Sequence, residues 1–244
     1  MTVSRAALLV LAALAALAAT TAFAMPGIAM CAAIQLMPLD ELPNGVSSDR
    51  AMNGANQRRF VLDYAAAIGR IERLYGKPRA RPYVIYLSKA DALWPLTFNS
   101  FGSTSFLPGR SCIVLGPDGS NVDVLAHELV HAEIADRVGY WRRWISIPVW
   151  FDEGAGMQVD QRPAFAAKWN PRTPSIINRT TAKSFFGVPP RQLTENYQNA
   201  KLVVADWLNR TGQNRFYDQL DGIRAGRGFD AMWSDQRSER ITTK

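Results

Sequence analysis

Apolar residues recur at intervals of three and four along several stretches of this chain, which is the spacing of a helix with one buried face. The first stretch ends at Gly76 and Pro78, which stop a helix. A second begins after Ser120 or Asn121, either of which can cap a helix N-terminus, and ends at Gly139. The pattern predicts helices over residues 58–75, 121–138, 149–160, 196–209, 216–223 and 229–233.

Two short β-prone runs lie between the first two predicted helices. Residues 82–87 and 111–115 are rich in Val, Ile, Leu and Tyr, which indicates strands. Residues 25–50, 94–109 and 162–191 contain many Pro, Gly or Ser residues without a clear period, and we predict irregular structure there. The predicted fold class is therefore α+β, with a small mixed or antiparallel sheet packed on the helix over 121–138 and a mainly helical C-terminal subdomain.

The first 24 residues resemble a secretory signal peptide. Arg5 supplies a positive charge, residues 6–19 are an apolar run, and Ala22-Phe23-Ala24 offers a cleavage site. We expect export to the periplasm or the exterior; the alternative is an uncleaved membrane anchor, because apolar residues continue patchily to Met37. The predicted organisation is a signal peptide (1–24), an irregular segment (25–50), a compact domain (51–160), and a loop with a helical subdomain (161–244).

Cysteine content and charge add two expectations. Cys31 and Cys112 are an even pair, which favours one disulfide in an oxidising compartment; the alternative is two unrelated buried thiols. The formal net charge is +7, but the basic residues are spread along the chain without a compact block. This distribution favours a solvated surface, or peripheral association with an anionic envelope or membrane, over nucleic-acid recognition.

The chain has only two histidines, and both lie in the pentapeptide His127-Glu128-Leu129-Val130-His131. On a helix, residues four apart lie about 40° apart around the axis, so both imidazoles share one face. Two imidazole nitrogens at this spacing can hold one Zn²⁺ at about 2.0–2.1 Å each. Glu128 projects beside the metal, where a general base must lie.

A zinc site needs a third protein ligand, and no histidine is left to serve. A carboxylate is therefore expected. Glu133 and Asp136 lie on the same helix but point away from the histidine face. Glu153, on the next predicted helix, is the preferred third ligand, and Asp152 and Asp160 are the alternatives.

With these residues the chain resembles the gluzincins of the peptidase MA clan. The resemblance is carried by His127, Glu128, His131 and Trp-Phe-Asp-Glu-Gly at 150–154, which is similar to the family's W-x-x-E-G. It implies a zincin-like catalytic domain over 51–160, one zinc per chain, and substrate backbone bound along an edge strand over 111–115.

A weaker resemblance concerns Tyr197. The segment Tyr197-Gln198-Asn199-Ala200 is similar to a C-terminal segment of small peptidase-MA-like proteins, in which a tyrosine hydroxyl stabilises the oxyanion. We therefore take Tyr197 as the candidate for that role. Met157 stands where thermolysin-like enzymes have an aspartate, so the partner of the first histidine is not identified from the sequence.

The resemblance implies a zinc metallopeptidase that acts on a peptide or protein substrate, with Glu128 as general base. The G-x-M-E-N motif of aminopeptidases is missing, which favours an endopeptidase. Two alternatives remain at this point: a catalytically inactive envelope protein that keeps the fold as a binding module, and a zinc hydrolase of a non-peptide bond.

Overall fold

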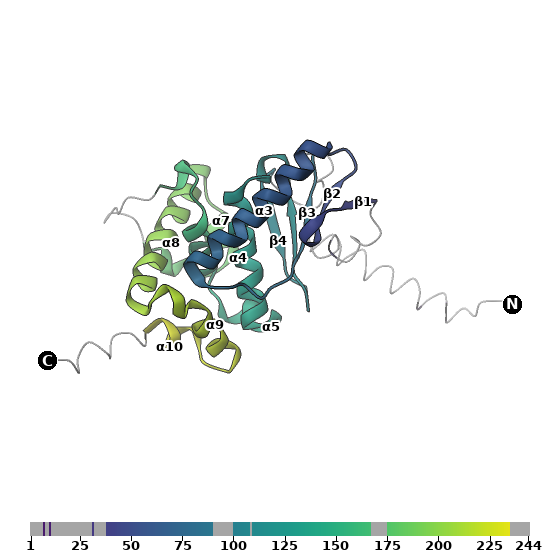
Figure 1. Cartoon of the computed structure of the whole chain (residues 1–244). Helices are drawn as coiled ribbons and strands as arrows, with labels where there is room; N and C mark the ends of the chain where they lie inside the picture. Colours follow the sequence, from purple (N-terminus) through teal and green to yellow (C-terminus); the bar gives the residue numbers. More distant parts are fainter. Residues whose placement is uncertain are drawn as a thin grey trace.

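The structure, a computed structural model, describes Ala7, Val10, Cys31 and residues 38–89, 100–107, 109–166 and 175–234. Within these residues the chain is α+β, as predicted, with a small mixed sheet and eight α-helices (Figure 1). The predicted signal peptide over 1–24 lies outside the described residues except for Ala7 and Val10. No helix in the described part of the chain is long and apolar enough to cross a bilayer.

The sheet has five strands in the order β1-β2-β3-β5-β4. Strands β2, β3 and β5 are parallel to one another, and the outer strands β1 and β4 each pair antiparallel with a neighbour. The strands are β1 (Leu39–Glu41), β2 (Val46–Asp49), β3 (Tyr83–Tyr86), β4 (Gly102–Ser105) and β5 (Cys112–Leu115).

Three of these strands differ from the sequence-based predictions. Residues 38–50 hold β1 and β2, and the predicted loop over 94–109 contains β4, so irregular structure was the wrong expectation for both segments. These strands are polar and only partly buried, and backbone pairing with a neighbour forms them without an apolar alternation. The expectation that β5 is the edge strand was also wrong, because β4 lies outside it.

Two long helices, α3 (Gly54–Tyr75) and α4 (Val122–Val138), pack on one face of the sheet (Figure 1). Side chains alternate along each strand, so Val84 and Ile113 point into the core beneath these helices. The side chain of Asn121 accepts a hydrogen bond from the Val124 N–H at 3.0 Å and caps α4, as predicted.

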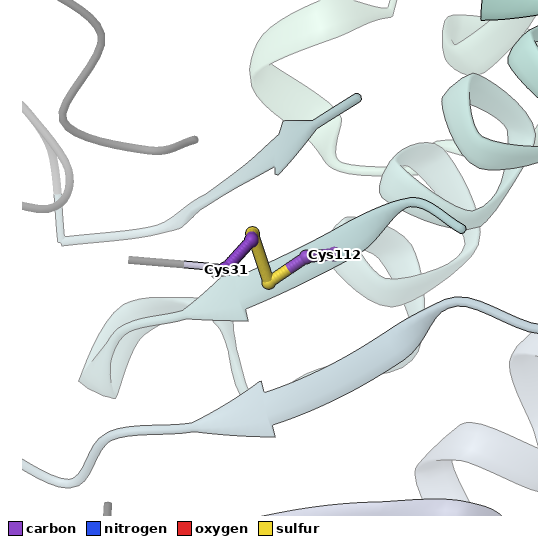
Figure 2. The surroundings of a disulfide bond; sticks show 2 residues. All are labelled: Cys31 and Cys112. Atoms are coloured by element: carbon purple, nitrogen blue, oxygen red, sulfur yellow. A yellow bond between two sulfur atoms is a disulfide. The ribbon is translucent and has the colours of Figure 1, made fainter. Parts of the chain in front are cut away.

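The opposite face of the sheet carries a second, smaller core. Ile85, Leu87, Cys112 and Val114 are at most 3% exposed and pack there with Cys31. Cys31 and Cys112 form a disulfide with their Cα atoms 5.8 Å apart, which joins the N-terminal segment to β5 (Figure 2).

The described part of the C-terminal half is mainly helical. Helix α6 packs between α4 and α8, and Phe151 of α6 lies among aromatic rings of the later helices. The helices are α5 (Tyr140–Ser146), α6 (Val149–Val159), α7 (Ala182–Phe186), α8 (Pro190–Thr211), α9 (Phe216–Arg224) and α10 (Phe229–Ser234).

All six predicted helices end within two residues of those observed, but α3 begins four residues before its predicted start at 58 and α8 begins six residues before its predicted start at 196. Pro190 occupies its first turn, where a proline costs no hydrogen bond. The predicted loop over 162–191 contains α7 and two 3₁₀ turns, and α5 was not predicted at all. Segments this short leave little periodicity to detect.

Candidate metal centre

His127 and His131 lie one turn apart on α4, with their ring centroids separated by 4.7 Å. Both side chains are buried, and α6 packs against the helix α4 that carries them. Their position follows from the local sequence, because the apolar residues around them bury α4 on nearly every side.

Glu153 reaches the two histidines from the first turns of α6. Its Oε2 atom lies 3.2 Å from His127 Nε2 and 3.6 Å from His131 Nε2. Ligands of a tetrahedral zinc at about 2.0–2.1 Å from the metal lie roughly 3.3 Å from one another. The donor atoms of these three residues all lie within 4.8 Å of one another, so they could hold a metal ion. The structure thus brings together the three residues that the sequence predicted.

The Nδ1 nitrogens of the two histidines each lie near a further carboxylate, at different distances. His131 Nδ1 lies 3.1 Å from Asp152 Oδ1, and His127 Nδ1 lies 3.8 Å from Asp160 Oδ2. A carboxylate at Nδ1 holds the proton there and leaves Nε2 free to bind a metal. Asp152, considered as an alternative ligand from the sequence, therefore lies at the distance of a partner for His131, whereas Asp160, the other alternative, is too far from His127 for a hydrogen bond.

Each of these two aspartates is itself held by an arginine. Arg143 of α5 donates to Asp152, and the pKa of Asp152, which burial alone would raise, is lowered by Arg143 and His131. Arg162 donates to both oxygens of Asp160 and lowers its pKa against burial in the same way. Sequence reasoning missed both arginines, because neither lies in a recognisable motif.

The candidate ligands His131 and Glu153 stabilise each other's charged forms. Burial would raise the pKa of Glu153, but the two histidines outweigh it and lower that pKa strongly. Burial would lower the pKa of His131, but Asp152 and Glu153 outweigh it and raise that pKa well above its ordinary value. Two imidazoles and a carboxylate form a donor set that suits zinc and related divalent cations.

Two glycines allow α6 to approach its neighbours closely. A Cβ atom on Gly156 would lie 3.0 Å from ring atoms of His127, so the histidine ring needs this space. A Cβ atom on Gly154 would lie 2.6 Å from the carbonyl oxygen of Ala200 in α8. Gly156 therefore lets α6 approach α4, and Gly154 lets it approach α8.

Glu128 lies between the histidines and the edge strand β4. The Thr104 hydroxyl of β4 donates to Glu128 Oε2 at 2.6 Å. Glu128 is 8% exposed, so this hydrogen bond satisfies a nearly buried carboxylate and orients it. Thr104 was not recognised from the sequence, since β4 itself was not predicted.

Tyr197 lies on the other side of the histidines, on α8. Its ring centroid is 6.3 Å from that of His127, and Phe165 and Phe185 pack against it. Burial, together with the negative charges of Glu153 and Glu128, raises the pKa of its hydroxyl well above the ordinary value. The hydroxyl therefore keeps its proton and can act as a hydrogen-bond donor.

Glu133 and Asp136 face away from the histidines, as predicted. Glu133 accepts the backbone N–H groups of Arg79 and Ala80 at 2.9 and 2.8 Å and pairs with Arg137. Asp136 accepts from Arg79 at 2.7 Å. These carboxylates attach the segment before β3 to α4 and have no part in the metal centre.

Comparison of the chain with protein-family models, curated proteins and solved structures finds no match. The proposed function therefore rests on the geometry of the candidate metal centre alone.

Proposed function

We propose that this protein is a zinc-dependent peptidase of gluzincin type, acting as an endopeptidase on peptides or proteins. One observation carries the proposal: three buried donor atoms converge, and a further carboxylate, Glu128, lies between them and an edge strand. His127, His131 and Glu153 would hold the zinc. Zinc in such a site supplies Lewis acidity, which polarises a scissile carbonyl and lowers the pKa of water to about 7.

Glu128 acts as the general base in this proposal. Its carboxylate takes a proton from the attacking water and returns it to the nitrogen of the leaving amine. The Thr104 hydroxyl, 2.6 Å from Oε2, holds the carboxylate on the side of β4. The Tyr197 hydroxyl stays protonated and donates a hydrogen bond to the oxyanion.

The substrate backbone is proposed to lie along β4. Of the described strands, β5 is the one neighbour of β4, so β4 is the edge of the described sheet, and a sheet edge is where an extended peptide can add as a further strand. An extended peptide there would pass beside Glu128, which contacts the same strand through Thr104.

We further propose that the protein acts outside the cytosol. The Cys31–Cys112 disulfide is favoured by an oxidising compartment. The composition of residues 1–24 supports the same location.

The decisive experiment compares wild type with Glu128→Gln. The variant keeps the ligands and is expected to bind one zinc per chain, as measured by metal analysis, while cleavage of a broad peptide library falls by at least about 10²-fold. Glu195→Gln, which changes a carboxylate exposed on α8, serves as the matched control and retains activity. Wild-type cleavage by Glu128→Gln would overturn the mechanism, and zinc binding without cleavage by wild type would favour a binding module.

A further inference from the structure

Helix α5 exposes large apolar side chains to solvent. Trp141, Trp144 and Ile145 are 74%, 52% and 81% exposed, and Arg142 between them is also exposed. Tryptophan rings combined with an arginine are typical of protein surfaces that enter the interfacial region of a bilayer. Arg143 on the same helix is buried against Asp152, so it holds this face outward.

A hollow lined by arginines lies directly beside this helix. It has a volume of about 560 Å³ and lies between the ends of β3, β4 and β5 and the second half of α4. Tyr140 of α5 forms part of its wall, and the Tyr140 ring contacts that of Trp141. In Figure 1, α5 and α9, which contributes Arg224 to the hollow, lie at the same end of the molecule.

The charges in this hollow are poorly neutralised by the protein. Four arginines and one acidic residue line it, and Arg79 pairs with that residue, Asp136. The other three arginines are exposed, and within the described part of the chain no carboxylate pairs with any of them. They are Arg81, Arg110 and Arg224.

Backbone carbonyls hold these three side chains in place instead. Arg81 donates to the carbonyl of Ala80 at 2.9 Å, Arg110 donates to the carbonyl of Arg81, and Arg224 donates to the carbonyl of Asp136 at 2.8 Å. A carbonyl orients a guanidinium group without cancelling its charge. The remaining N–H donors are therefore available to an anion, for which planar guanidinium groups are well suited.

We propose that the exposed face of α5 and the arginine-lined hollow together form a docking surface for an anionic phospholipid membrane. Trp141, Trp144 and Ile145 enter the interfacial region, and the three arginines bind lipid phosphate groups. The net charge of +7 adds a general attraction to such a surface. Membrane docking requires no hydrolysis, so it can be tested independently of the proposed peptidase activity.

Tryptophan quenching by brominated acyl chains tests this proposal on the full chain. Bromine quenches only tryptophans that reach the bilayer, and residues 1–24 contain none, so that segment gives no signal of its own. Quenching is expected with vesicles of phosphatidylglycerol and phosphatidylcholine in equal parts, and to be weak with phosphatidylcholine alone. It should also weaken as salt is raised. Equal quenching in both vesicle types, or in neither, would overturn the proposal.

Two pairs of variants locate the surface. Trp141→Ser with Ile145→Ser is expected to raise the vesicle concentration for half-maximal quenching about tenfold, and Arg81→Gln with Arg224→Gln by at least about tenfold. Leu62→Ser, at a 69% exposed apolar position on α3, and Arg58→Gln with Arg191→Gln are the matched controls and should leave it unchanged. Controls that weaken binding as much as the test variants, or test variants that bind like wild type, would refute this surface.

Discussion

Arg143 of α5 reaches the candidate metal centre indirectly, through Asp152 and then His131. Its guanidinium donates to Asp152, and Asp152 faces the Nδ1 atom of His131. Both charged side chains are almost fully buried, at 10% and 1% exposure. A buried carboxylate of this kind is tolerated because it is paired, and its position then determines the orientation of the imidazole.

We predict that Arg143→Met weakens zinc binding by about 10- to 100-fold, because Asp152 loses its partner and no longer holds His131 firmly. The free energy of unfolding should fall by about 3 kcal/mol, since a buried charge is left with less compensation. Competition with a chromophoric chelator measures the first effect and thermal unfolding the second.

Two further variants separate positioning from general destabilisation. Arg143→Lys keeps the charge and should recover part of the zinc affinity. Arg191→Met removes an arginine whose side chain is 94% exposed, and should change stability by less than about 0.5 kcal/mol. If Arg143→Met is less stable but binds zinc as tightly as wild type, the positioning role is wrong.

Among single residues, the sequence identified those whose chemistry depends on local spacing. His127 and His131 share a helix face through their four-residue separation, and Glu153 was found because no third histidine exists. The roles of Asp152 and Asp160 could not be assigned in the same way. They depend on how α6 crosses α4, which local periodicity does not specify.

Helix α6 packs closely against two other helices, and a different glycine lies at each of the two contacts. Gly156 faces the ring of His127 in α4, while Gly154 faces the backbone of Ala200 in α8. We predict different consequences for an added methyl group at each position.

Gly156→Ala places a methyl group about 3.0 Å from His127, so the ring must tilt and zinc affinity should fall about tenfold or more, with little loss of stability. Gly154→Ala instead forces α6 away from α8 and should cost about 1–3 kcal/mol of unfolding free energy. Chelator competition and thermal unfolding of both variants distinguish the two effects. Equal zinc affinity in Gly156→Ala and wild type would contradict this interpretation of the contact.

Among the elements, long helices with one apolar face were predictable and short or polar elements were not. The 22 residues of α3 repeat their apolar spacing several times, whereas α5 has seven residues and an exposed apolar face. Strand β4 reads Gly-Ser-Thr-Ser and has no alternation of apolar and polar residues. It exists because its backbone pairs with β5, a contact that only the folded chain provides.

For the whole molecule, the metal centre depends on residues that are distant in the sequence. The candidate ligands come from α4 and α6, and Tyr197 comes from α8. The carboxylate of Glu128 beside the ligands accepts a hydrogen bond from β4. The α+β class followed from the order of the predicted elements. The strand order, which places β4 rather than β5 at the edge, required the tertiary structure.

The Cys31–Cys112 disulfide lies on the face of the sheet opposite the metal centre and affects the stability of the whole chain. Cys31 and Cys112 are 81 residues apart in the sequence, so their bond removes many conformations from the unfolded chain. It also holds Cys31 over the smaller core of Ile85, Leu87 and Val114. Because the helices that carry the metal ligands pack on the other face, loss of the bond should alter stability more than zinc binding.

We predict that Cys31→Ser with Cys112→Ser lowers the free energy of unfolding by about 2–5 kcal/mol. Zinc affinity of the folded protein should stay within about twofold of wild type, because α4 and α6 keep their contacts. Denaturant unfolding with and without reductant measures the first effect: reductant should weaken wild type and leave the double variant unchanged. A double variant that is as stable as wild type would show that Cys31 contributes little to the folded state, whereas a large loss of zinc affinity would mean that the two faces of the sheet are coupled.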